Sequence, residues 1–441
     1  MKDITFRNSM KYGDLTTKLS LLILGLGNFR GRQIIKGILY IALEAAFIIF
    51  MIIKGISCLA GLPGLGSREQ EEIWNEKLGI YEYVQGDNSL LILLYGITVI
   101  FIICAYIILA VSSLKSAYNV ELRMKQGKHI NTFVEDIKAL FNENLHKPVT
   151  GILVFTILPL VFMISMAFTS YSKVDSHLVL FDWVGLENFK LIFNSGSSIG
   201  QSFWSVFGWT IIWAVLATFL NYILGILVAL LINRKGTKFK SFWRFIFILS
   251  IAIPQFVSLL IIRSMLAQDG IINVVLKNAG WISKSLPFFT NATWARMTVI
   301  IVNLWIGIPY TILQVTGILQ NIPMELYEAA DVDGANGFVK FFKITMPYML
   351  FVTTPYLITT FTANVNNFNI VYLLTKGDPV LAGHTAGKTD LLVTWLYKMT
   401  VDYQYYNLGA VIGIMTFVFL ALGSLLVYRR TKSYKDEEGF Q

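Results

Sequence analysis

The chain has 441 residues, of which 55% are hydrophobic and 14% are charged, and its mean hydropathy is +0.62. These values are rare in a soluble domain and typical of a protein that crosses a membrane several times, because each helical crossing needs about 20 apolar residues. The net charge of +9 could indicate nucleic-acid binding, but membrane proteins collect lysine and arginine on cytoplasmic loops, and we prefer that explanation.

Apolar runs in chain order predict about eight membrane-spanning helices. Helices are expected because an open sheet edge would leave backbone groups without hydrogen bonds in lipid. The first run has no small-residue cleavage site after it, so it predicts a permanent span and not a signal peptide. The predicted spans are 34–53, 90–111, 149–170, 203–232, 242–266, 296–319, 349–374 and 408–428.

Loops rich in lysine and arginine alternate with loops that are poor in them, which sets the direction of the spans. About 23 basic residues lie in the N-terminal tail, after the second, fourth and sixth spans, and in the C-terminal tail, whereas about nine lie in the alternate loops. Both termini are therefore predicted in the cytoplasm. The acidic loop 55–89 falls outside and predicts a solvated cap, and the external segments 171–202 and 267–295 carry tryptophans that suit interfacial anchoring or docking of an outside protein.

Several residues that could carry chemistry do not form a recognisable site. Cys58 and Cys104 lie in or beside apolar runs, which argues against a disulfide framework, and the four histidines lack metal-ligand spacing. The glycine-rich stretch LGLGNFRG near Gly25 resembles a nucleotide-binding loop, but no strand precedes it, so we treat this resemblance as chance. Glu44, in the middle of the first span, is expected either to pair with a polar neighbour or to be protonated.

The polar stretch 321–347, which lies between two apolar spans, predicts two short helices joined by a turn. Pro323 suits the first turn of a helix, and the acidic residues after it complement the helix dipole. Gly334 interrupts this helix, since glycine permits the left-handed backbone that ends one. A second helix is predicted over 338–344, ending before Pro347. From these features alone, an interfacial amphipathic element and a docking surface are equally open.

Polar side chains recur at positions i, i+4 and i+7 in the sixth and seventh spans, which places each set on one helix face. Amides and hydroxyls with a tyrosine ring suit a neutral, hydroxyl-rich solute, although membrane helices also use such residues to bond to one another. The last six spans contain almost no acidic residue, which favours a neutral substrate and an external energy source over a proton-coupled carrier. The residues are Asn303, Gly307 and Tyr310 in the sixth span and Thr360, Asn364 and Asn367 in the seventh.

The stretch 321–347 resembles the EAA loop of ABC importer permeases. The pattern is E-A-A, three residues, G, nine residues and I-T-M-P, which departs from that family only at Met346, where leucine is usual. In that family the loop inserts into a groove on a cytoplasmic ATPase, so the resemblance implies that Glu328 pairs with a basic ATPase residue and that Gly334 permits the turn. The coupling residues that the resemblance implies are Glu328, Ala329, Ala330, Gly334, Phe338, Ile344 and Pro347.

The resemblance covers most of the chain from about Pro148, in stretches such as TANVNNFNIVYLLTKGDP, and points to the larger permease subunit of maltose and maltodextrin importers. That subunit has eight spans, six of them a common core. Its best-known member has tyrosine at the position of Ile251 and serine at those of Gln255 and Thr360, so a different hydrogen-bond pattern and a different or longer glucan are implied. That member's large external domain between spans three and four is missing here, so a binding protein would dock on smaller loops. The implied substrate-binding residues are Ile251, Gln255, Asn303, Gly307, Tyr310, Thr360, Asn364 and Asn367.

The predicted fold is an all-α polytopic membrane protein with a six-helix ABC importer permease core. The predicted domains are 1–147, an N-terminal tail with two accessory spans; 148–430, the permease core, which contains the cytoplasmic coupling loop 321–347; and 431–441, a cytoplasmic tail.

The leading hypothesis is the transmembrane subunit of an ATP-driven importer of maltodextrin-type oligosaccharides in a bacterial cell membrane. The resemblance implies a second permease subunit, two ATPase subunits and an extracytoplasmic sugar-binding protein as partners. ATP and Mg²⁺ would bind to the ATPase, and this chain, which lacks a Walker lysine loop, is expected to hold no cofactor and no catalytic residue. The alternatives are the same role for a raffinose-like sugar, a galacto-oligosaccharide or a polyol, or a secondary carrier that needs no ATPase. A membrane-embedded enzyme is disfavoured, since the spans show no His/Asp/Glu cluster.

Overall fold

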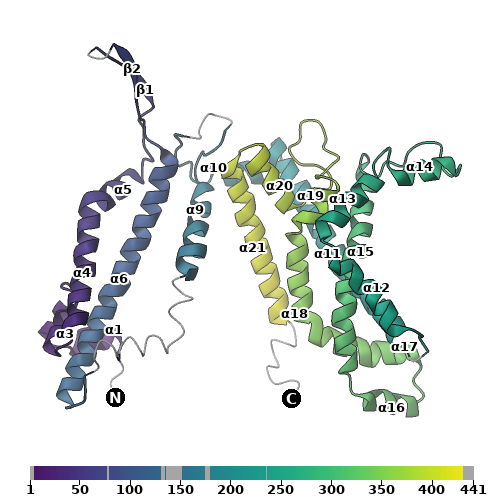
Figure 1. Cartoon of the computed structure of the whole chain (residues 1–441), viewed down its shortest axis with the longest axis horizontal. Coiled ribbons are helices and arrows are strands. Elements are labelled where there is room, and N and C mark those ends of the chain that lie inside the picture. Colours follow the sequence, from purple (N-terminus) through teal and green to yellow (C-terminus); the bar gives the residue numbers. More distant parts are fainter. Residues whose placement is uncertain are drawn as a thin grey trace. The chain divides into compact units, whose positions relative to one another are not determined.

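The computed structural model describes residues 4–76, 79–130, 135, 151–173, 179–234 and 236–430. The chain forms two compact units, Met1–Gly185 and Leu186–Gln441 (Figure 1). The predicted tail 431–441 and the predicted domain boundary at 147/148 lie outside the described residues, so both stay predictions.

The described part of the first unit is mostly helical, and two of its helices are long and apolar enough to cross a membrane. One runs without a break through α4, η1 and α5, and the other is α6, with 37 residues. The third predicted span corresponds to shorter helices, η2 and α9. The elements are α1 (Phe6–Tyr12), α2 (Leu15–Leu19), α3 (Leu26–Arg30), α4 (Ile34–Phe50), η1 (Met51–Gly55), α5 (Ile56–Gly61), β1 (Glu71–Asn75), β2 (Ile80–Val84), α6 (Ser89–Lys125), η2 (Leu153–Ile157) and α9 (Leu158–Met166).

A β-hairpin in the first unit departs from the all-α prediction. Strands β1 and β2 pair antiparallel within the acidic loop that was expected to be only a solvated cap. Trp74 lies opposite Tyr81, and their rings meet edge to face with centroids 5.0 Å apart. Gly79 precedes β2 with a φ of +65°, a conformation that glycine adopts without strain. Aromatic and β-branched residues favour strands, so this signal was in the sequence, but the acidic residues between them concealed it.

The second unit is built around α11, whose packing against α15 and α18 is the most extensive among its helices. Trp209, Trp213 and Ala217 of α11 are buried against Val299 of α15 and Val371 of α19. The elements are α10 (Glu187–Phe193), α11 (Ser198–Asn233), α12 (Lys240–Ala252), α13 (Gln255–Met265), α14 (Ile271–Asn278), α15 (Ala292–Gln320), α16 (Met324–Val332), α17 (Gly337–Lys340), η3 (Phe341–Thr345), α18 (Met346–Val365), α19 (Phe368–Leu374), α20 (Leu392–Tyr397), η4 (Lys398–Asp402) and α21 (Tyr406–Arg430).

Two of the predicted spans in this unit are broken. The fifth divides into α12 and α13 at Ile253, whose backbone is extended because the ring of Pro254 disfavours a helical residue before it. The seventh divides into α18 and α19 at Asn366 and Asn367. Across the described residues of both units, five helices have the length and apolarity of a membrane span, so the count of eight stays a prediction.

Loops that the charge pattern assigned to opposite sides of the membrane lie at opposite ends of the second unit. Figure 1 shows α16 and α17 at the lower end of this unit and α14 and α20 at its upper end. The stretch 321–347 was predicted in the cytoplasm, and α14 belongs to a segment predicted outside. The alternation of basic and neutral loops therefore agrees with the path of the chain within this unit.

A buried ion pair fixes the 375–391 loop at the upper end. Lys398 Nζ lies 2.7 Å from Oδ2 of Asp390, which is fully buried. The backbone N–H of Gly387 and the hydroxyl of Thr394 also donate to this carboxylate, at 2.7 and 2.9 Å. Burial raises the pKa of the Asp390 carboxyl, against the opposing effect of the Lys398 ammonium. A Cβ on Gly377 would lie 2.1 Å from Oδ1 of Asp390, so the loop closes tightly over the pair.

Candidate functional site

A polar cavity of about 240 Å³ lies among α11, α13, α15, α18 and α19. Seven of the eight residues predicted to bind substrate line this cavity. The eighth, Ile251, lies in α12 before the break at Pro254, is half-buried, and does not line the cavity. The seven residues are Gln255, Asn303, Gly307, Tyr310, Thr360, Asn364 and Asn367.

Helix α11 contributes three lining residues that the sequence analysis did not identify: Thr218, Asn221 and Tyr222. Their spacing of i, i+3 and i+4 places them on one helix face, so a search for polar faces in the fourth span would have found them. Thr311 of α15 and Tyr356 of α18 were missed as well. The cavity thus has three tyrosine rings, two of which the sequence analysis overlooked.

Two asparagine side chains in the cavity have unused hydrogen-bonding atoms. Among the described residues, neither the buried Nδ2 of Asn303 nor the buried Oδ1 of Asn221 has a hydrogen-bond partner. An unpaired buried polar atom costs about 1–3 kcal/mol, so a folded protein rarely keeps one without a reason. One atom is a donor and the other an acceptor, and a ligand hydroxyl could satisfy either.

Asn364 and Asn367 have structural roles that the sequence analysis left open. The amide of Asn364 donates to the hydroxyl of Thr218 at 3.0 Å, which joins α18 to α11. Asn367 lies beyond the end of α18, and its side chain caps α19 by accepting from the N–H of Ile370 at 3.4 Å. The i+7 spacing therefore does not run along one continuous helix, and Asn367 reaches the cavity because the helix breaks.

Gly307 allows α11 and α15 to approach closely. A Cβ at this position would lie 2.2–2.7 Å from the three outer atoms of the Asn221 side chain. One turn further along both helices the contact is reversed: a Cβ on Gly225 would lie 2.5 Å from the side chain of Thr311. Small residues at such crossings are typical of packed membrane helices. Gly307 therefore acts in helix contact and also sets the position of the Asn221 amide in the cavity.

Replacing Gly307 by alanine is expected to destabilise the protein by about 1–3 kcal/mol through overpacking and to displace Asn221. Gly317 on the same helix is the matched control, because a Cβ there meets nothing within 4 Å. Gly317→Ala should be neutral or slightly stabilising, since alanine is about 1 kcal/mol more favourable than glycine inside a helix. Thermal unfolding of the purified variants compares them, and equal melting temperatures would contradict the packing role of Gly307.

The coupling loop 321–347 begins as the sequence predicts. Helix α16 starts after Pro323 and ends before Gly334, which has a φ of +74°. The N–H of Ala335 donates to the carbonyl of Ala330 at 2.8 Å, and that of Gly334 donates to the carbonyl of Asp331 at 3.1 Å. These two bonds form a Schellman motif, which satisfies carbonyls that the helix end leaves free.

The second half of the loop differs from the prediction of a short helix that ends before Pro347. Helix α17 continues through the wide turn η3 directly into α18, with Pro347 in the first turn of α18. Proline is tolerated there because its missing N–H falls at a helix start, and the wide turn displaces the carbonyl that its ring would strike. The stretch 321–347 is thus joined without a break to α18, a helix that lines the cavity.

Two side-chain contacts hold the two halves of the loop together. The hydroxyls of Tyr327 on α16 and Thr345 on η3 lie 2.8 Å apart, and Lys340 forms an ion pair with Asp331. The remaining face carries an acid and an aromatic ring: Glu328 is exposed, and Phe338 is 72% exposed and packs on Phe342. Of the other predicted coupling residues, Ala329, Gly334 and Pro347 are exposed, and Ala330 and Ile344 are half-buried. The stretch 321–347 thus exposes an acid and an aromatic ring on one face.

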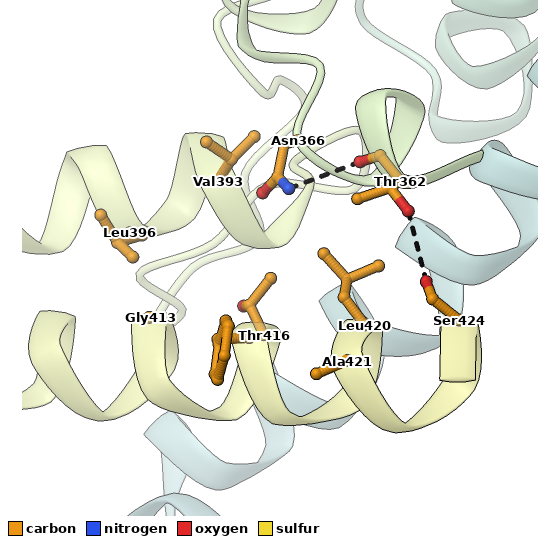
Figure 2. A pocket seen from close by; sticks show the side chains of 10 residues that line it. Thr362, Asn366, Val393, Leu396, Gly413, Thr416, Leu420, Ala421 and Ser424 are labelled. Carbon is orange, nitrogen blue, oxygen red and sulfur yellow. Dashed lines mark hydrogen bonds between the residues drawn. The ribbon is translucent and has the colours of Figure 1, made fainter. Parts of the chain in front are cut away.

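Two larger cavities lie beside α21 and contain none of the predicted substrate-binding residues. One, of about 380 Å³, is shown in Figure 2; the other, of about 400 Å³, is lined mainly by apolar side chains. In Figure 2 the Asn366 amide donates to the Thr362 carbonyl at 3.4 Å, and the hydroxyls of Thr362 and Ser424 lie 3.5 Å apart. Polar groups here satisfy one another, so the smaller cavity is the better candidate site.

Comparison with known proteins identifies the family. Residues 221–433 match the family described as binding-protein-dependent transport system inner membrane component. Over 436 residues the chain is 36% identical to the galactooligosaccharides transport system permease protein GanP of Bacillus subtilis (strain 168), covering 97% of this chain and 100% of that protein. The chain belongs to this family.

Other relatives of the permease agree with this assignment. It is 32% identical over 436 residues to the maltodextrin transport system permease protein MdxF of Bacillus subtilis (strain 168), covering 95% of each. It is 36% identical over 249 residues to the maltose/maltodextrin transport system permease protein MalF of Escherichia coli (strain K12), covering 55% of this chain and 48% of that protein. The predicted family and the predicted membrane localisation are confirmed.

The fold of the permease is also similar to that of a solved ABC transporter. The crystal structure of a bacterial ABC transporter involved in the import of the acidic polysaccharide alginate matches it with a TM-score of 0.52 at 23% identity. The match covers 67% of this chain and 98% of that chain. The mostly helical, multi-pass fold predicted from the sequence is therefore confirmed.

Proposed function

We propose that this permease is the transmembrane subunit of an ATP-driven importer that carries neutral oligosaccharides of the maltodextrin type. The observation that carries the proposal is the polar cavity, whose fifteen lining residues include no Asp, Glu, Lys, Arg or His. An uncharged lining of amides, hydroxyls and tyrosine rings suits sugar hydroxyls and the apolar faces of sugar rings. A volume of about 240 Å³ is small for a ligand pocket, so these residues would hold part of an oligosaccharide and a second permease subunit would complete the site.

The proposed energy source lies outside this chain. In this proposal the coupling loop 321–347 docks on one of two ATPase subunits, which bind ATP and Mg²⁺, and Glu328 pairs there with a basic residue. An extracytoplasmic sugar-binding protein would deliver the substrate, in keeping with the description of the family as binding-protein-dependent. The exposed acid and aromatic ring of the loop and its rigid connection through η3 to α18 support this role.

Replacing Asn303 by leucine tests the cavity, because its buried Nδ2 has no partner among the described residues. Uptake of a labelled maltodextrin into proteoliposomes that hold the whole transporter should fall about 2- to 12-fold, which is the value of one neutral hydrogen bond. Thermal stability in detergent should stay unchanged or rise, since the substitution removes an unpaired polar group.

Two variants serve as controls for this experiment. Thr359→Val changes an exposed residue of α18 that does not line the cavity, and it should leave uptake unchanged. Asn364→Leu should lower both uptake and stability, because it also removes the bond to Thr218. Wild-type uptake by the Asn303 variant would refute the assignment of this cavity.

A galacto-oligosaccharide is the second candidate substrate, because the chain is 36% identical to a galactooligosaccharides permease over 97% of its length. Uptake of labelled maltodextrins and of galacto-oligosaccharides by the same proteoliposomes separates the two candidates. The experiment also tests the secondary carrier: uptake driven by a proton or sodium gradient without ATP would replace the ATP-driven proposal.

A further inference from the structure

The N-terminal helical segment, residues 5–33, packs with its polar and small side chains inward. It comprises α1, α2 and α3, which lie against α6 and, at α3, against α4, at the lower ends of those helices in Figure 1. A helix in water buries its apolar face, but here most of the buried side chains are polar, and Leu24 is the one large apolar side chain of the segment that is fully buried. The buried polar residues are Ser9, Thr17, Ser20, Asn28 and Gln33. This arrangement is the reverse of the one that water favours.

Hydrogen bonds account for the polar packed face. Glu121 of α6 accepts from the hydroxyl of Thr17 at 2.8 Å and from the N–H of Asp14 at 3.0 Å. Glu44 of α4 accepts from the N–H of Leu24 at 2.9 Å and from the Tyr106 hydroxyl at 3.2 Å. The carboxylate of Glu44, in the middle of the first predicted span, therefore accepts from this segment. This agrees with the first of the two expectations for Glu44, that it pairs with polar neighbours.

Glycines bring the segment close to the helices that it covers. A Cβ on Gly27 would lie 2.4 Å from Cβ of Ala117, and one on Gly31 would lie 2.4 Å from Cγ1 of Val120. Gly25 has a φ of +82°, and its N–H donates to Ser113 at 2.8 Å. Close backbone approach through small residues is how helices pack in membranes. The stretch LGLGNFRG, which resembles a nucleotide loop, is thus a packing motif.

The outward face of the segment is apolar. Leu15 and Leu22 are 73% and 72% exposed, and Ile23 is 49% exposed. The other large apolar side chains that the segment exposes are Phe6, Met10 and Tyr12. In water this surface would cost about 25 cal/mol per Å², whereas against acyl chains it costs nothing. It continues directly into the exposed isoleucines at 34, 35 and 38 that begin the first span.

The position and charge of the segment indicate which part of the membrane it occupies. It contacts α6 at Ser113, Ala117 and Glu121, just past residue 111, where the predicted second span ends. Loops at this end of the spans are the basic, cytoplasmic ones. The segment itself exposes Arg7, Lys11, Lys18, Arg30 and Arg32, whose long side chains can reach lipid headgroups from an interfacial helix.

We propose that the N-terminal helical segment lies within the cytoplasmic leaflet of the membrane, with its apolar face on acyl chains and its basic side chains at anionic headgroups. The predicted cytoplasmic tail is then embedded in the membrane, where it packs on α6 and, through α3, on α4. This proposal does not depend on the substrate or on the ATPase.

Spin labels test the proposal in the full-length protein reconstituted into nanodiscs of phosphatidylethanolamine and phosphatidylglycerol. With Cys58 and Cys104 replaced by serine, single cysteines are placed at Leu15 and at Leu22, whose exposure lets them accept a label. Ile52, 71% exposed in the first span, is the lipid control, and Glu72, exposed in strand β1 of the acidic hairpin, is the water control. Power saturation compares collisions with oxygen, which dissolves in lipid, and with a water-soluble nickel chelate.

Labels at Leu15 and Leu22 are expected to collide with oxygen in preference to nickel, as at Ile52, and a label at Lys18 should lie between the two controls. A nickel accessibility at Leu15 and Leu22 equal to that at Glu72 would place the segment in water and overturn the proposal. Protection from both reagents would overturn it too, because a protein surface would then cover the apolar face.

Discussion

A transporter assembled with Glu328→Ala in this chain is expected to lose most of the ATPase stimulation that a sugar-loaded binding protein produces. Glu328 is exposed on α16, and the contacts that hold the loop together, Tyr327 with Thr345 and Asp331 with Lys340, do not involve it. The loop should therefore keep its shape. Truncating one partner of a desolvated charge pair at an interface costs about 2–5 kcal/mol, so stimulated hydrolysis should fall by about 25-fold or more.

Glu325→Ala is the matched control, since Glu325 is an exposed glutamate one turn earlier on the same helix. Its carboxylate favours the helix start, a contribution of about 0.3–1 kcal/mol, and it is not one of the implied coupling residues. ATP hydrolysis is measured in nanodiscs with and without loaded binding protein. If the two variants are stimulated to the same degree as wild type, Glu328 does not couple this chain to the ATPase.

The sequence predicted the first helix of the stretch 321–347 well because the signals for its ends are local. Pro323 and Gly334 act on their own backbone, and the structure shows a helix start and a left-handed helix end at these residues. The error at Pro347 has a physical origin: a proline favours a helix boundary before it, but a wide turn absorbs the steric conflict and lets the helix continue. A rule about the residue before a proline cannot show this.

The cavity was predicted less completely because it is a tertiary feature. Periodicity brought Asn303, Gly307 and Tyr310 onto one face, and the structure places them together. It could not show that Asn221 packs on Gly307, since these residues are 86 positions apart in the chain. The family resemblance, which implied both Ile251 and Gln255, could not separate them, because the break at Pro254 sends the two residues into different helices.

The N-terminal helical segment shows a different limit of sequence reasoning. Its basic residues predicted a tail on the cytoplasmic side and left its depth open, since charge patterning reports the side of the membrane and not the depth. Depth depends on which face is outward, and that is known only once Thr17 and Leu24 are seen to bond to Glu121 and Glu44.

Lys398→Met is expected to destabilise the permease by about 3–5 kcal/mol, because it leaves the carboxylate of Asp390 buried without its counter-ion. The damage should spread from the 375–391 loop to α11 and α15. The Trp209 ring donates its N–H to the carbonyl of Thr389 at 3.3 Å, and Arg296 donates to that of Lys388 at 2.8 Å while its guanidinium lies 4.4 Å from the Trp209 ring.

The double variant Asp390→Asn with Lys398→Met distinguishes a lost charge pair from lost packing. It removes both charges at nearly constant volume, so most of the stability should return, as for other buried pairs replaced as a unit. Lys376→Met, the same substitution at an exposed lysine of this loop, should change stability by less than about 0.5 kcal/mol. Thermal unfolding in detergent measures all three. A double variant as unstable as Lys398→Met would mean that the Lys398 side chain holds this loop by packing, and that the ion pair contributes little.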